Sequence, residues 1–152
     1  MENMDRNREA RVWQRVMGRD NPNMPELRRD NLKPLILEAQ ENTAAFRALA
    51  LQLIGKQWEG LRRLETESMR LTWTLRGICA LRGESLKLAP LPQPREQPRK
   101  LLEKCFRRAR NLWEETERRC MDPEFAPVFR ALEALTREQC TATAELLGKL
   151  ES

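Results

Sequence analysis

Residues 83–98 read GESLKLAPLPQPREQP, and this stretch decides how the rest of the chain is arranged. Its prolines forbid a continuous helix, because each ring removes a backbone donor and clashes with the preceding turn, so the stretch should be extended. The four positions are Pro90, Pro92, Pro94 and Pro98. An extended segment of this length can cross from one end of a helical domain to the other, so it predicts a long crossover between two helical hairpins.

Two amphipathic helices are expected before the crossover. The first begins near Asp30 or Asn31 and ends at Ile54, and the second covers about residues 57–81 before Gly83. Apolar residues recur at steps of three and four, which places one face of each helix inward. The inward positions are Leu35, Glu38 or Ala39, Asn42, Phe46, Leu49 and Leu53, then Leu61, Leu64, Ser68, Leu71, Leu75 and Ile78. Because the connection is short, these helices should form an antiparallel hairpin.

Two more helices are expected after the crossover. One covers about residues 99–120, and the other follows Asp122, a candidate cap, and stops near Gly148. Their inward positions are Leu102, Cys105, Ala109, Leu112, Thr116 and Cys120, then Phe125, Val128, Leu132, Leu135, Gln139, Thr143 and Leu146. The prediction is an all-α protein, a ferritin-like antiparallel four-helix bundle over residues 30–152. Residues 1–29 are expected to form a short amphipathic helix, about Arg8 to Met17, and a linker.

The composition excludes several classes of function. The 152 residues contain no histidine and no tyrosine, and neither a phosphate-binding loop nor a nucleophile elbow is found, so a non-catalytic role is favoured and no cofactor is predicted. The net charge of +5 is modest and basic residues do not alternate with aromatics, which makes a nucleic-acid partner unlikely. With no signal-peptide pattern and no apolar span, we expect a cytoplasmic protein without membrane contact. The four cysteines match no metal or redox spacing.

Several segments resemble small bacterial ferritin-like proteins related to rubrerythrin. They are LILEAQENTAAFRALALQLIG (35–55), PRKLLEKCFRRARNLWEE (98–115), DPEFAPVFRALEALTREQCTATAELLG (122–148) and, at the start, VWQRVMG (12–18). The resemblance implies a di-iron site in the bundle core that supports peroxide reduction, iron oxidation or iron storage. It also implies self-association as a homodimer.

The ligands that the resemblance implies are missing from this chain. The Glu-x-x-His positions of the second helix fall at Ser68 and Leu71, and those of the fourth helix at Thr136 and Gln139. The glutamate position of the third helix is Ala109, so only Glu38 in the first helix is a candidate ligand. We therefore expect a degenerate metal site inside an ordinary packed core.

An alternative keeps the metal. Hard oxygen ligands can hold iron or manganese, and a reduced carboxylate set around Glu38 would then support a metal-binding oxidoreductase. A buried Glu38 would need a partner such as Asn42 or Gln139, or its pKa would rise.

Candidate interaction residues lie in two places. The densest basic cluster surrounds Arg107 and Arg108 near the start of the third helix, where positive charge opposes the helix dipole, and it is a candidate site for an acidic protein partner. The alternative is a solvated helix face whose basic residues pair with acidic ones one turn away, such as Glu103 with Arg107. Trp13 in the leading helix is a candidate recognition residue. The other tryptophans, Trp58, Trp73 and Trp113, are typical of packing or of an interface edge.

Overall fold

The computed structural model describes residues 31–151 of the chain, which are all-helical and contain no β-strand. Four long helices belong to one compact unit, Lys33–Ser152. They are α3 (Lys33–Gln52), α4 (Gly60–Leu81), α5 (Pro98–Arg118) and α6 (Ala126–Glu151). The predicted leading helix, with Trp13, lies outside the described residues.

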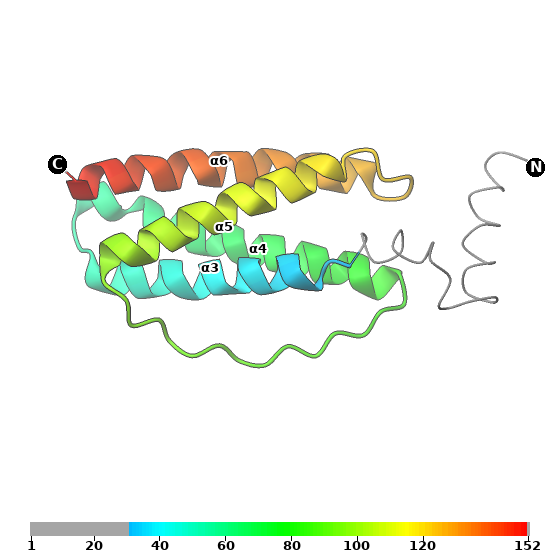
Figure 1. The fold of residues 1–152 in the computed structure, drawn as a ribbon, viewed down its shortest axis with the longest axis horizontal. Helices are drawn as coiled ribbons and strands as arrows, with labels where there is room; N and C mark the ends of the chain where they lie inside the picture. Colours follow the sequence, from blue (N-terminus) through cyan, green and yellow to red (C-terminus); the bar gives the residue numbers. More distant parts are fainter. Residues whose placement is uncertain (1–30, 152) are drawn as a thin grey trace, which may run out of the picture. The chain divides into compact units, whose positions relative to one another are not determined.

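The helices form two antiparallel hairpins, α3 with α4 and α5 with α6 (Figure 1). Between the hairpins, α3 packs against α5 extensively, whereas α4 and α6 touch only sparsely. Figure 1 shows α4 and α5 running in one direction and α3 and α6 in the other. Helices that are neighbours in space are therefore antiparallel.

The proline-rich segment is the crossover that the sequence predicts. Residues 84–97 contain no helix and run the length of the domain from the end of α4 to the start of α5 (Figure 1). Pro98 occupies the first turn of α5, where its missing N–H removes no intrahelical bond. The side chains of Leu86, Leu88 and Leu91 are half-buried, so the crossover lies against the helices rather than standing off them.

The start of the second helix differs from the prediction. A short 3₁₀ helix, η1 (Lys56–Trp58), precedes α4, which begins at Gly60 rather than near Gln57. Gly55 has φ of 135°, a conformation that a side chain would strain, and this turn directs Trp58 into the core. Burial of a large aromatic side chain outweighs the local preference for an earlier helix start.

The last helix is also longer than predicted, because it continues through Gly148 to Glu151. Glu151 accepts a hydrogen bond from Arg99 at 3.2 Å, and Leu150 packs against the hydrophobic core. These tertiary contacts offset the cost of about 1 kcal/mol for glycine inside a helix.

An ion pair joins the two hairpins at one end of the domain. Arg82, just after α4, lies 2.9 Å from the carboxylate of Asp122 and 5.4 Å from the ring centroid of Phe125. The same carboxylate accepts hydrogen bonds from the N–H groups of Glu124 and Phe125, so it also caps the turn before α6 as predicted. Asp122 thus stabilises both the turn and the contact between hairpins.

Candidate functional site

The core of the domain contains a set of fully or nearly buried polar side chains on all four helices. They are Asn42, Ser68, Thr72, Thr116, Thr136, Gln139 and Thr143. A buried polar group destabilises the fold unless it finds a hydrogen-bond partner. The partners of these side chains therefore show whether this layer is ordinary packing or is built to receive a ligand.

On the α3–α4 side, polar side chains bond to neighbouring backbone. The Ser68 hydroxyl donates to the carbonyl of Ala39 at 3.1 Å. The Asn42 amide donates to the carbonyl of Cys105 at 3.3 Å, and its oxygen accepts from Arg108 at 3.2 Å. These bonds link α3 to α4 and to α5, so the side chains serve helix packing.

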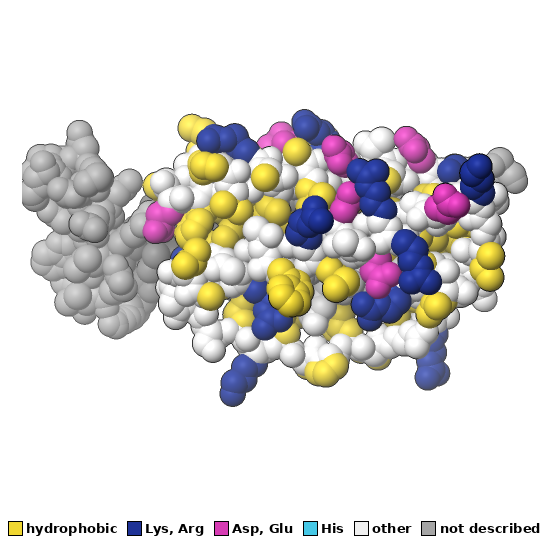
Figure 2. Space-filling view, turned by 180° about the vertical axis from the view of Figure 1, so that it is seen from behind, with side chains coloured by type: hydrophobic (Ala, Val, Ile, Leu, Met, Phe, Trp, Pro, Cys, Tyr) yellow, Lys and Arg dark blue, Asp and Glu magenta, His cyan; other side chains and the backbone are white. Residues whose placement is uncertain are grey.

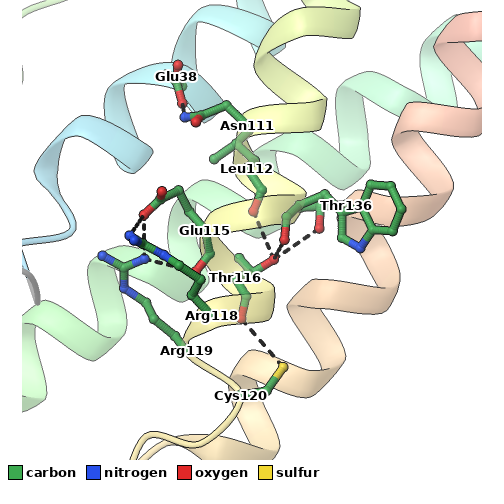
Figure 3. Close-up of polar contacts among 10 residues, drawn as sticks. Glu38, Asn111, Leu112, Glu115, Thr116, Arg118, Arg119, Cys120 and Thr136 are labelled. Atoms are coloured by element: carbon green, nitrogen blue, oxygen red, sulfur yellow. Dashed lines mark hydrogen bonds and ion pairs between the residues drawn. The ribbon is translucent and has the colours of Figure 1, made fainter.

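Between α5 and α6, two threonines meet. The hydroxyl oxygens of Thr116 and Thr136 lie 3.2 Å apart, and the Thr116 hydroxyl also lies within hydrogen-bond distance of the Leu112 carbonyl (Figure 3). The Thr136 hydroxyl lies within hydrogen-bond distance of the Leu132 carbonyl, one helical turn earlier. Cys120 donates to the carbonyl of Thr116 at 3.5 Å. The polar atoms of this layer are satisfied within and between the two helices.

Gln139 is the exception in this layer. Its side chain is fully buried, and neither amide atom has a hydrogen-bond partner among the described residues. An unsatisfied buried amide costs about 1 to 3 kcal/mol. The buried Gln139 amide therefore destabilises the packed core.

Glu38 lies at the edge of the core rather than within it. Ala39 takes the inward position of α3, while Glu38 is half-buried and accepts a hydrogen bond from the Asn111 amide on α5 (Figure 3). Its partner is thus Asn111, and neither Asn42 nor Gln139 as the sequence suggested. Burial, opposed by this hydrogen bond, raises the pKa of the Glu38 carboxyl above its ordinary value.

A second carboxylate, that of Glu115, lies on α5 one helical turn after Asn111 and is bound by two arginines. Burial alone would raise the pKa of Glu115, but hydrogen bonds from Arg119 and Arg118 outweigh it and lower the pKa below its ordinary value. The donor–acceptor distances are 2.8 Å and 2.6 Å (Figure 3). Glu115 is therefore an ionised carboxylate, and both arginines donate to the same oxygen, Oε1.

All the positions where the resemblance places missing ligands are buried. Ser68, Leu71, Ala109, Thr136 and Gln139 have no exposed surface, which confirms their predicted inward placement. Within residues 31–151, no group of three or more Cys, Asp or Glu side chains is arranged to hold a metal ion. The candidate ligand Glu38 therefore belongs to no such group among the described residues.

The two arginines predicted to contact an acidic partner differ in their surroundings. Arg108 turns toward α3, where it contacts Glu41 at 3.5 Å as well as Asn42, and it is largely covered. Arg107 is exposed to solvent. Lys104 is paired with Glu96 of the crossover. Of the two arginines predicted to contact an acidic partner, the structure leaves only Arg107 at the surface.

The cysteines are free thiols within the helical core or at its margin. Burial raises the pKa of Cys79 to about 11, of Cys105 to about 12 and of Cys140 to about 11. A thiol that stays protonated at neutral pH is a poor nucleophile and a poor metal ligand. These side chains serve packing, as the sequence indicates.

One surface feature escapes the sequence predictions. A hollow of about 250 Å³ lies between α3 and α4 beside the crossover, lined in part by Gln40, Trp73 and Arg76. Trp73 is 72% exposed, and the side-chain oxygen of Gln40 is buried without a partner in the described residues. The sequence does contain a signal for this surface site. Trp73 lies off the inward stripe of α4, and Arg70 and Arg76 lie three residues away on either side of it.

Comparisons of the chain with protein-family models, curated proteins and solved structures found no match. Among residues 31–151, no helix combines the length and apolar character needed to cross a membrane. The described residues form an all-α domain whose packed core includes several buried polar side chains.

Proposed function

We propose that this chain is a ferritin-like four-helix bundle, related to rubrerythrin, that has lost its di-iron ligands and acts as a non-catalytic structural or interaction protein. Two antiparallel hairpins joined by an end-to-end crossover are the arrangement of ferritin-like bundles, which supports the first part. Self-association as a homodimer is part of the same proposal.

One observation supports the loss of ligands above all others: the positions expected to bind metal contribute to packing instead. Leu71 and Ala109 supply no donor atom, and the Ser68 hydroxyl is bonded to the backbone of α3. The hydroxyls of Thr136 and Thr116 are bonded to each other and to their own helices. A di-iron centre needs several carboxylates and imidazoles converging on one layer, and these residues do not fit it.

The alternative is a metal-binding oxidoreductase that uses Glu38. The observation in its favour is that Glu38 is half-buried, with Glu41 and Glu115 near enough to raise its pKa by repulsion. Against it, Asn111 donates to one Glu38 oxygen, and Arg118 and Arg119 both donate to Oε1 of Glu115. A cation placed among the three carboxylates would compete with these donors.

Thermal unfolding with and without metal tests the proposal. A metal at about 100 times its Kd adds about 2.7 kcal/mol, or about 5 to 11 °C in Tm for a domain of this size. We expect Fe²⁺, Mn²⁺ and Zn²⁺ to leave the Tm of the full chain unchanged relative to EDTA. Stabilisation that is abolished by Glu38→Ala and kept by Glu59→Ala, an exposed control, would establish the alternative.

A further inference from the structure

We propose that the hollow beside Trp73 is a docking site for an acidic peptide segment of a partner protein, with one apolar side chain seated on Trp73 and a neighbouring carboxylate on Arg76. This inference rests on the proposed function, because it names the class of partner that such an interaction protein would bind.

The apolar part of the site is an exposed tryptophan. Trp73 projects from the outer face of α4, and the half-exposed Met69 and the crossover residue Leu91 line the hollow with it. Tryptophan, methionine and arginine are enriched at protein interfaces, and tryptophan and arginine most often dominate binding energy. In the view from behind, hydrophobic side chains lie beside basic ones in the middle of the face (Figure 2).

The charge of the lining has one sign. Arg47 and Arg76 line the hollow, and no carboxylate does. Arg47 shares its charge with Glu65 at 2.7 Å, whereas Arg76 has no ion pair within residues 31–151. A cation beside an exposed aromatic ring is complementary to an acidic segment with an apolar side chain.

A buried acceptor points to a peptide backbone. Gln40 lines the hollow, and its side-chain oxygen is buried without a hydrogen-bond partner among the described residues. If this side chain turned into the hollow, a peptide N–H would supply the missing donor, as backbone groups do in many peptide-binding sites. The hollow, at about 250 Å³, lies below the range of about 300 to 1,000 Å³ typical of small-molecule pockets and suits a single side chain better.

One other surface and one other occupant of this hollow fit less well. The larger groove between α4 and α6 is lined by residues of both charges, and its Arg63 and Glu67 already form an ion pair at 2.9 Å. It therefore favours neither an acidic nor a basic partner. Single-stranded nucleic acid stacks on successive aromatic rings, whereas Trp73 is the one aromatic side chain lining this hollow. A peptide is therefore the occupant that this hollow favours.

The test uses the full chain and fluorescence anisotropy with labelled short peptides. Each peptide has a central Leu, Phe or Trp flanked by Asp or Glu, and each has a matched peptide with Asn or Gln in place of the acids. We expect saturable binding of acidic peptides, at least about 10-fold tighter than their amide counterparts. Trp73→Ala and Arg76→Glu should each weaken it by about 10-fold or more.

Matched controls lie elsewhere on the surface. Met121→Ala removes another exposed apolar side chain, and Arg62→Glu reverses an exposed charge on α4 away from the hollow, so both should keep the affinity within about 2-fold. All four substituted side chains are exposed, so unchanged far-UV circular dichroism is expected throughout.

Four results would overturn the inference: no binding of any acidic peptide, equal binding of the amide peptides, equal loss with Arg62→Glu, or tighter binding of a single-stranded oligonucleotide that depends on Trp73. Tightly bound metal in the core would refute the proposed function but would leave this peptide binding unaffected. Failure of peptide binding by a metal-free protein would refute only the docking site.

Discussion

Replacing the buried amide of Gln139 should stabilise the protein. Both polar atoms of this side chain are buried without a partner in the described residues, and an unsatisfied buried amide costs about 1 to 3 kcal/mol. Methionine has a similar length, is unbranched and adapts to an existing space, so Gln139→Met removes the polar penalty with little change in packing. We expect the free energy of unfolding to rise by about 1 to 3 kcal/mol.

Urea unfolding followed by far-UV circular dichroism measures this change as a higher midpoint with an unchanged slope. Gln52→Met at the exposed end of α3 is the matched control, expected within about 0.5 kcal/mol of wild type. Gln139→Ala should instead destabilise the protein, because it leaves a cavity. If Gln139→Met destabilised the protein by about 1 kcal/mol or more, the amide would have to be engaged by a bound group, contrary to the account of this core.

Three further predictions follow from other contacts. A double-mutant cycle with Arg82→Ala and Asp122→Ala should give a coupling energy of about 1 to 3 kcal/mol from urea unfolding, since both side chains are largely covered, and additive effects would show that the pair does not join the hairpins. Because folding raises the pKa of Glu38 above 4.5, the folded chain binds the proton more readily, and stability should fall as pH rises from 4.5 through the raised pKa. Glu38→Gln should flatten this part of the stability profile while keeping an acceptor for Asn111, and an unchanged profile would contradict the assignment. Iodoacetamide at about pH 8 should modify the native protein first at Cys120, the least buried thiol, and should reach Cys105 only in urea, as read by mass spectrometry; early labelling of Cys105 would show that the core opens.

Much of the helical arrangement is visible in the sequence because its causes are local. The prolines of the crossover exclude helix, and apolar steps of three and four place residues such as Leu61 and Leu112 inward. The ends of helices are less predictable, because distant contacts decide them. Trp58 is drawn into the core by the Gly55 turn, and α6 is extended past Gly148 by contacts with α5.

The site could be predicted only in part for a related reason. Periodicity is enough to place Ser68 inward. On the fourth helix it selects Leu135, whereas the structure buries Thr136 fully and leaves Leu135 half-buried. The pairing of Glu38 with Asn111 joins residues 73 positions apart and depends on the register between α3 and α5, which no single helix encodes. The hollow at Trp73 likewise forms only when the crossover lies beside α3 and α4.

Elemental analysis of the full chain tests the central claim most directly. The protein would be produced with iron, manganese and zinc supplementation, purified without chelator, and compared with Glu38→Ala and with Glu59→Ala as an exposed control. A core whose ligand positions are used for packing predicts far less than one metal ion per chain in all three proteins. Near-stoichiometric iron or manganese in the wild type and in Glu59→Ala, lost in Glu38→Ala, would contradict it.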